Sequence, residues 1–309
     1  MIAGVNDEIR TLARRFLETD TGFQLDSVAY AWSDDSAASR VETLADALYQ
    51  QLYTRKLSEI PTVAPNIEPL PRGYSATLDN ANTGRGWQLR GFMIVSQRDS
   101  ELLVAAPCGT RYQAKLNDIV AQERGPDPTV AIQMPKGDVT SSNGFYIASG
   151  DAFTGDLGRG VIRFYWNIGT ARLGPLLMEG ITSVLNGARL PFRFKIVNSR
   201  FGLARRDTAV LYISEQSARL QEIDDILELT RGYERMLIDD APLFTERVQL
   251  GVSRAKDPRD GRSFGQYVCA TIAETILSRS RQFESIDGNE LCQSVFAALG
   301  SPATLAPLR

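Results

Sequence analysis

The sequence predicts an α+β fold with a central, mostly antiparallel sheet, helices packed around it and a helical segment at the N-terminus. Two observations carry this prediction. Apolar residues recur every three or four positions near both ends of the chain, whereas they alternate every second position in its middle. The strand-like segments also cluster together instead of alternating singly with helices, which is typical of an antiparallel sheet.

The first elements are helical. Residues 5–18 and 38–57 each place apolar side chains on one face of a helix. Four prolines in "SEIPTVAPNIEPLPRGY" then interrupt helical structure and indicate an extended connector. We therefore expect two units, a helical N-terminal segment of residues 1–60 and an α+β domain of residues 61–309.

From Trp87 the apolar pattern changes to a period of two. Expected strands are two segments within 87–107 joined by a turn at Gln97–Ser100, then 130–134, 144–147, 161–167, 192–197 and 208–213. Expected helices are 171–186, a helix that follows an N-cap at Ser214, and the C-terminal segments 264–280 and 288–299.

Composition narrows the range of functions. The chain has 309 residues, of which 43% are hydrophobic and 23% charged, as in an ordinary globular protein. Its formal net charge of −3 disfavours general nucleic-acid binding. No apolar run reaches the roughly 18 residues of a membrane span, and early carboxylates argue against a secretory signal. Three widely spaced cysteines suit a reducing compartment. We expect a cytoplasmic protein whose partners include neither nucleic acid nor membrane.

Histidine is absent from the sequence. This excludes Ser-His-Asp and Cys-His nucleophile pairs and zinc sites that contain histidine. If the protein is an enzyme, Lys, Tyr, Asp or Glu must move the protons. We expect neither a metal ion nor a cofactor.

The most unusual segment carries positive charge without counter-charge. Between Glu179 and Asp207 there are six Lys or Arg residues and no carboxylate. In "PFRFKIV" the strand period places Phe192 and Phe194 on one face, and Arg193 and Lys195 on the other. The charged face is either a solvated surface or the floor of a cleft.

Two other segments repeat this design. "VIRFYWN" places Arg163 and Tyr165 on one face, and "ARRDTAVLYI" places Arg206 and Asp207 just before a strand that contains Tyr212. If these strands are neighbours, their cationic faces form a concave site for a doubly charged anion such as phosphate, which arginine binds through paired contacts. Asp207 is either a structural ion-pair partner or a residue that fixes a cation against the ligand. Lys136, in "MPKGD", is either solvated or a ligand contact.

Six stretches in register give the chain a family resemblance. They are "GFYIASGDA", "VIRFYWNI", "LPFRFKIVN", "RRDTAVLYI", "APLFTERVQLGVSRAKDP" and "GRSFGQYVCATIAETIL". In this order they resemble the HopA-type effector family over roughly residues 75–285. The family is named for a type III secretion effector, and its domain also occurs in gene clusters for class V lanthipeptides and thioamitides.

The resemblance implies a lyase that needs no cofactor. In those clusters an aminoglycoside-phosphotransferase-like kinase phosphorylates Ser or Thr of a precursor peptide, and the lyase eliminates the phosphate. The product is dehydroalanine or dehydrobutyrine. The expected partners are therefore the phosphorylated precursor peptide and the kinase. The alternatives are a non-catalytic module that binds phosphopeptide or kinase, and a type III effector-like protein.

Residue roles follow from this chemistry and not from a known catalytic map. Lys195 is our candidate base: cationic neighbours and partial burial push its pKa down, bound phosphate pushes it up, and the sequence leaves the balance open. Tyr165 or Tyr212 is the candidate acid for the leaving phosphate, and Asp207 is expected to orient a cation. The expected phosphate ligands are Arg163, Arg206, Arg193 and Lys136.

Overall fold

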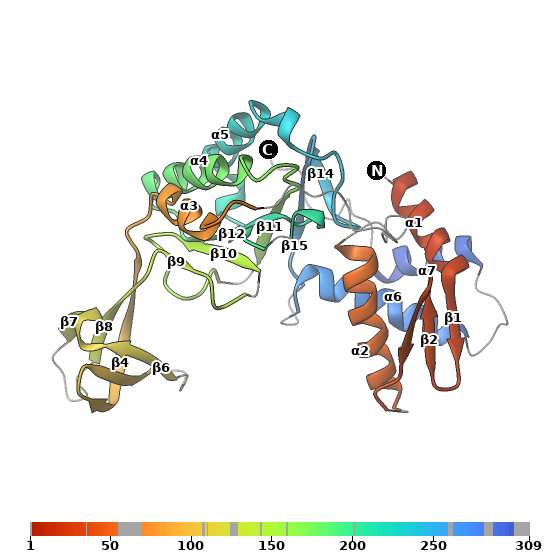
Figure 1. The fold of residues 1–309 in the computed structure, drawn as a ribbon, viewed down its shortest axis with the longest axis horizontal. Helices are drawn as coiled ribbons and strands as arrows, with labels where there is room; N and C mark the ends of the chain where they lie inside the picture. The colour runs from red at the N-terminus through yellow and green to blue at the C-terminus, as the bar shows by residue number, and fades with distance from the viewer. Residues whose placement is uncertain are drawn as a thin grey trace.

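The computed structural model describes residues 2–34, 36–54, 70–106, 109, 111–123, 129–142, 144–158, 160–199, 202–258, 262–280 and 287–299. These residues form helices and three sheets in which every strand pairing is antiparallel, so the predicted α+β class is confirmed. Figure 1 shows the largest sheet in the centre beneath a layer of helices, with a small sheet on one side and the N-terminal helices on the other.

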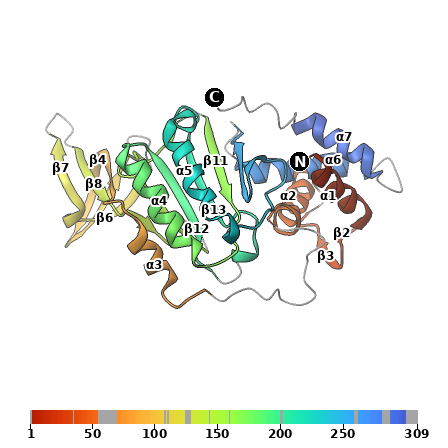
Figure 2. The ribbon, with the colours of Figure 1, turned by 90° about the horizontal axis from the view of Figure 1, so that it is seen from above.

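The central sheet has seven strands in the order β14-β15-β11-β13-β12-β10-β9. The strands are β9 (Gly137–Asp138), β10 (Phe145–Ser149), β11 (Val161–Trp166), β12 (Phe192–Val197), β13 (Ala209–Ser214), β14 (Glu246–Gln249) and β15 (Val252–Lys256). Helices α3 (Tyr74–Ala81), α4 (Leu173–Gly187) and α5 (Gln221–Arg231) cover one face of this sheet (Figure 2). The other face carries polar side chains of the strands and a small apolar cluster of Tyr165, Val210 and Ala255, against which Phe264 packs.

The predicted apolar faces of two strands are confirmed. Phe192 and Phe194 of β12 and Phe164 and Trp166 of β11 are buried in one core together with apolar residues of α4 and α5. Ser214 does not cap α5, as the sequence suggested. It ends β13, and its hydroxyl accepts from the backbone N–H of Ser217 at 3.1 Å, because a short 3₁₀ turn lies between the strand and α5.

The N-terminal segment forms a second core. Its elements are α1 (Ile2–Arg15), β1 (Phe16–Thr19), β2 (Gly22–Leu25), β3 (Val28–Ala31), α2 (Ala37–Leu48) and the π-helical turn η1 (Tyr49–Tyr53), and α6 (Phe264–Ser280) and α7 (Gly288–Leu299) pack against them. The expected boundary at residues 60 and 61 lies outside the described residues. The two C-terminal helices share the core of the N-terminal segment and not that of the central sheet.

A five-stranded sheet on the other side has a small core of its own. Its strands are β4 (Trp87–Arg98), β5 (Glu101–Ala105), β6 (Arg111–Lys115), β7 (Ile119–Glu123) and β8 (Thr129–Met134), in the order β6-β5-β4-β8-β7. Phe92, Val104 and Ile132 are among the buried residues of this core. At its base, Trp87 packs edge-on against Phe153, with ring centroids 4.8 Å apart, and so reaches the central sheet.

One buried arginine joins the N-terminal segment to the central sheet. Arg206, only 2% exposed, lies just before β13. Its guanidinium donates to Glu8 of α1 at 2.6 Å, to Asp240 at 2.8 Å and to the carbonyl of Leu52 in η1 at 3.1 Å. Because a charge withdrawn from water is stable only when it is fully paired, this network fixes both units in one arrangement.

We expect Arg206→Met to lower the free energy of unfolding by about 3–5 kcal/mol, because it leaves two carboxylates without their shared cation. The measurement is urea denaturation followed by tryptophan fluorescence. Arg231→Met is the control, since Arg231 forms an exposed ion pair with Glu228 within α5 and should change stability by less than about 1 kcal/mol. Equal effects of the two substitutions would contradict the role of Arg206.

Candidate functional site

Three neighbouring strands bring the predicted cations together on the face of the central sheet opposite to the helices. Tyr212 of β13 is paired with Arg163 of β11 on one side and with Arg193 of β12 on the other. These three residues therefore form one row across the sheet. Val210 is paired in the same way with Tyr165 and Lys195, which form the next row of the same face. The sequence left open whether these strands are neighbours. Because they are, most of the candidate residues lie together on one face of the sheet.

A cavity of about 360 Å³ opens over these rows. Arg193, Lys195 and Tyr212 line its polar side. The remaining lining residues come from the adjacent strands and from the loops beside them, and they are Ser141, Ser142, Ile147, Phe153, Gly155, Asp156, Leu157, Val161 and Asp257. The cavity is therefore cationic at its floor and partly apolar along its walls.

Arg193 and Lys195 are the cations of this cavity without a counter-charge. Within the described part of the chain, neither side chain has a carboxylate within ion-pair distance, and the buried Nε of Arg193 has no hydrogen-bond partner. The Arg193 guanidinium lies 5.8 Å from the ring centroid of Phe153. This half-buried side chain therefore keeps a buried donor that no acceptor satisfies, and the arrangement favours an anionic ligand.

Lys195 lies over aromatic rings. Its Nζ is 4.4 Å from the ring centroid of Phe145 and 5.7 Å from that of Tyr212. Burial acts to lower the pKa of Lys195, but Tyr212, Asp207 and Tyr49 outweigh it, so the pKa lies above its ordinary value. The sequence left this balance open, and the neighbours that decide it are two phenol groups and a carboxylate.

Arg163 is already engaged by a carboxylate. Its guanidinium forms an ion pair with Asp257, with contacts of 2.5 and 2.7 Å, and stacks on the ring of Tyr212 at 4.6 Å. Asp257, not Arg163, lines the cavity. Arg163 therefore supports the ring of Tyr212 and does not itself line the cavity. A ligand would have to displace Asp257 to contact Arg163.

Asp207 holds a cation, but the cation is Arg205. Asp207 is 2% exposed and accepts two hydrogen bonds from the Arg205 guanidinium, at 2.7 and 2.8 Å. Arg205 in turn lies 5.5 Å from the Phe145 ring centroid, on the same ring that Lys195 covers. The sequence contained a signal for Arg205, because in "ARRD" two adjacent arginines precede a strand and cannot both point the same way.

Arg206 and Tyr165 also lie away from the cavity. Arg206 is turned toward Glu8 and Asp240, and this placement does not support phosphate binding. Tyr165 is buried, with its hydroxyl 3.5 Å from that of Tyr53, and burial raises its pKa. It therefore lies beneath the site and does not line the cavity.

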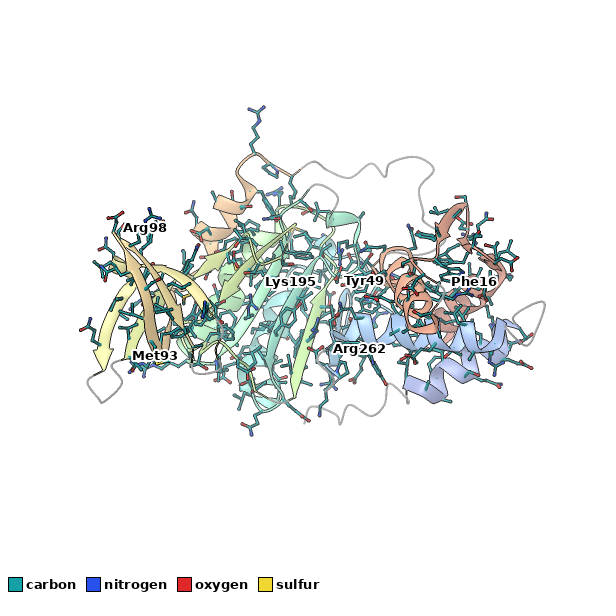
Figure 3. All side chains as sticks on the ribbon, turned by 90° about the horizontal axis from the view of Figure 1, so that it is seen from below. Phe16, Tyr49, Met93, Arg98, Lys195 and Arg262 are labelled. Carbon is teal, nitrogen blue, oxygen red and sulfur yellow. The ribbon has the colours of Figure 1, made fainter. Side chains whose placement is uncertain are left out.

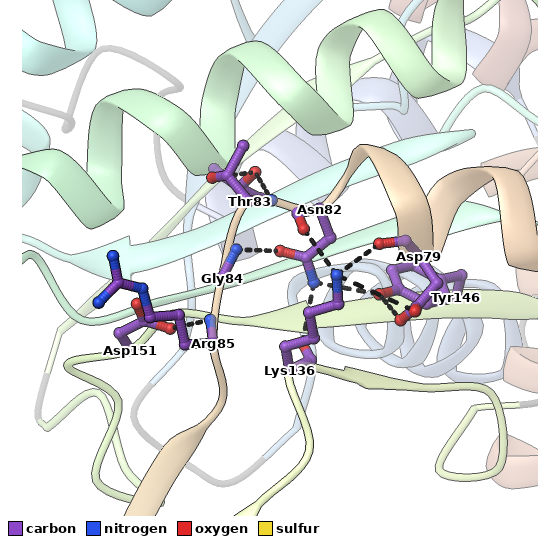
Figure 4. Close-up of polar contacts among 9 residues, drawn as sticks. Asp79, Asn82, Thr83, Gly84, Arg85, Lys136, Tyr146 and Asp151 are labelled. Atoms are coloured by element: carbon purple, nitrogen blue, oxygen red, sulfur yellow. Dashed lines mark hydrogen bonds and ion pairs between the residues drawn. The ribbon is translucent and has the colours of Figure 1, made fainter.

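Lys136 has a structural position. Its ammonium donates to the backbone carbonyls of Asp79 and Asn82, at 2.8 and 2.9 Å, and so caps the C-terminal end of α3 (Figure 4). Asn82 also donates to the carbonyl of Lys136 and to the hydroxyl of Tyr146, which ties α3 to the strand β10. This placement does not support the expected ligand contact.

The described residues contain no group of three or more acidic or cysteine side chains placed to hold a metal ion. In the same part of the chain, no helix has the length and apolar character needed to cross a membrane. Cys269 and Cys292 are buried and unpaired, while Cys108 lies outside the described residues.

We expect Arg193→Ala to weaken the binding of inorganic phosphate at least about tenfold, because a buried charged hydrogen-bond donor is worth more than 1 kcal/mol. Phosphate binding can be followed by chemical-shift changes of the backbone amides around the cavity. Lys136→Met should lower the melting temperature but leave phosphate affinity unchanged, since Lys136 binds only the end of α3. The reverse pattern would contradict the assignment of the site.

Comparisons with known proteins agree with this architecture. The sequence model of the HopA1 effector protein family matches residues 138–299. The structure of the effector protein from Pseudomonas syringae pv. tomato strain DC3000 is similar, with a TM-score of 0.51 and 13% identity over 97% of this chain and 95% of that chain. The effector protein from Pseudomonas syringae pv. syringae strain 61 gives a TM-score of 0.46 and 12% identity over 86% and 94% of the two chains. No curated protein matches the sequence.

Proposed function

The chain belongs to the HopA1 effector protein family, and from that premise we propose that it is a lyase acting on phosphoserine or phosphothreonine. Its substrate would be a precursor peptide phosphorylated by an aminoglycoside-phosphotransferase-like kinase, and its product dehydroalanine or dehydrobutyrine. One observation carries the proposal: Arg193 and Lys195 of a single strand line a cavity of about 360 Å³ without a carboxylate partner among the described residues.

Phosphate binding is the first task of such a lyase. A phosphorylated side chain carries about −1.5 to −2 charges at neutral pH. The planar guanidinium of Arg193 would donate hydrogen bonds to the phosphate oxygens, and the positive charge of Lys195 would add to the attraction. Asp207 and Asp257 are paired with arginines, and Asp156, the other carboxylate that lines the cavity, accepts a hydrogen bond from the backbone N–H of Gly158.

The elimination step needs a base and a leaving group. In our proposal the free amine of Lys195 takes the Cα proton, the electron pair of that C–H bond forms the Cα–Cβ double bond, and the Cβ–O bond breaks. Phosphate leaves with the electrons of that bond. The hydroxyl of Tyr212, which lines the cavity beside Arg193, is the group placed to donate a proton to the departing oxygen.

The raised pKa of Lys195 shapes this mechanism. At neutral pH the ammonium form predominates, and only a small fraction of the protein holds the amine that accepts a proton. Bound phosphate favours the ammonium further. The rate of elimination therefore depends on how much amine the pH allows.

The same observation favours a second function of another class. A lysine that stays protonated is well suited to hold phosphate without reaction, as in a non-catalytic phosphopeptide-binding module. In that case the charge of Lys195 would matter and its basicity would not.

Replacement of Lys195 separates the two functions. For a lyase, both Lys195→Ala and Lys195→Arg should lower the elimination rate by about 10²–10⁴, because neither variant retains an amine base. The assay is mass spectrometry of the kinase-phosphorylated precursor peptide, which detects the loss of phosphoric acid. Lys256→Arg is a matched control, since Lys256 pairs with Glu215 and does not line the cavity. Full elimination by Lys195→Arg would exclude Lys195 as the base.

We expect the elimination rate of the wild-type protein to rise about tenfold per pH unit between about pH 7 and 9, where the phosphate is already a dianion. The reason is that a base with a pKa raised above its ordinary value gains amine in proportion to pH throughout this range. Single-turnover rates across the range provide the measurement. A rate independent of pH would show that another group removes the proton.

A further inference from the structure

Two stacked tyrosines of the N-terminal segment lie at its contact with the central sheet. Tyr49 and Tyr53 occupy the π-helical turn η1, and their ring centroids are 5.5 Å apart with an interplanar angle of 15°. Single π-turns often mark functional positions, because they change which way the following side chains point. Figure 3 shows Tyr49 where the N-terminal helices meet the central sheet that carries Lys195.

The backbone of α6 holds this pair of rings in place. A Cβ atom at Gly265 would lie 2.5 Å from Cε1 of Tyr53 and 2.8 Å from Cε2 of Tyr49, so the rings rest directly on the glycine. At these distances any larger residue must displace the ring of Tyr53, which is buried, and the ring of Tyr49, which is half-buried. The two tyrosines are therefore rigidly placed.

Each tyrosine reaches a different part of the polar face. The hydroxyl of Tyr53 lies 3.5 Å from that of Tyr165, beneath the site. Tyr49 instead interacts with Arg205, whose guanidinium is 6.0 Å from the Tyr49 ring centroid. Arg205 binds Asp207 through two hydrogen bonds and shares the ring of Phe145 with Lys195.

We propose that Tyr49 is a positioning residue of the cationic site: it fixes Arg205 and Asp207 beside Lys195, so that the N-terminal segment completes the site. Tyr49 lies outside residues 138–299, to which the family match is confined. What the site does once completed rests on the proposed function. The positioning itself is a property of the free protein.

The electrostatic consequence concerns the ammonium of Lys195. Its charged and titratable neighbours come from several elements. They are Tyr212 in β13, Asp207 just before β13, Tyr49 of η1, Arg205 on the ring of Phe145 and Arg193 on the same strand as Lys195. Burial acts to lower the pKa of Lys195, whereas Tyr212, Asp207 and Tyr49 raise it. In the positioning role, removing the Tyr49 hydroxyl loosens Arg205 from Asp207, and the carboxylate that is freed should raise this pKa further.

The test follows the titration of Lys195 in protein labelled with ¹³C-lysine, without any substrate. We expect Tyr49→Phe to shift the midpoint of Lys195 upward by about half a pH unit. Tyr53→Phe is the matched control, because it removes the neighbouring hydroxyl, which contacts Tyr165 and not the Arg205–Asp207 pair. Lys195→Arg assigns the signal, and circular dichroism confirms the fold of each variant.

A second variant keeps the test decisive if Tyr49→Phe does not fold. Arg205→Gln frees the carboxylate of Asp207, so the midpoint of Lys195 should rise. The proposal is overturned if folded Tyr49→Phe leaves the Lys195 midpoint unchanged or gives the same midpoint as Tyr53→Phe. Where only Arg205→Gln folds, the proposal is overturned if that variant leaves the midpoint unchanged. A shifted midpoint in a protein that eliminates no phosphate would refute the proposed function and still support the positioning role.

Discussion

The structure depends on the opposite orientation of two adjacent arginines at the entrance of β13. Arg205 turns toward the polar face of the central sheet and binds Asp207, whereas Arg206 turns away and binds Glu8 and Asp240. Both arginines lie in the bend between the short 3₁₀ turn Gly202–Ala204 and β13, and their different partners divide them. One arginine therefore organises the candidate site, and the next fastens the N-terminal segment to the sheet that carries it.

The cations of this region fall into two groups, those with carboxylate partners and those without one. Arg163, Arg205 and Arg206 are each neutralised by carboxylates, and such pairs contribute to architecture more than to ligand binding. Arg193 and Lys195 remain over the cavity without a carboxylate partner in the described chain. Their lack of a carboxylate partner, beside arginines that are paired, is the contrast on which the proposed anion site depends.

The sequence predicts the sheet and its faces better than the partners of its charges. The alternation in "FRFKIV" was sufficient to place Phe192 and Phe194 in the core and Lys195 on the opposite face. It could not show that Arg206 meets Glu8, because that contact joins residues 198 positions apart. Nor could it show that Lys136 caps α3, because a solvated and a capping lysine look alike in a sequence. The short strands β1–β3 were missed because four-residue strands leave too brief a pattern.

The role of the N-terminal segment follows from the same long-range contacts. A lysine on a sheet face would be an ordinary surface cation if nothing covered it, and its protonation would follow bulk solvent. Here Tyr49 and the Arg205–Asp207 pair enclose it from the side of the N-terminal segment, while Tyr212 and Phe145 enclose it from the sheet. Arg206 fixes η1 in this position, because its guanidinium donates to the carbonyl of Leu52. In the proposed arrangement, the charge state of Lys195 therefore depends on how the two units are joined, through Tyr49 and the Arg205–Asp207 pair.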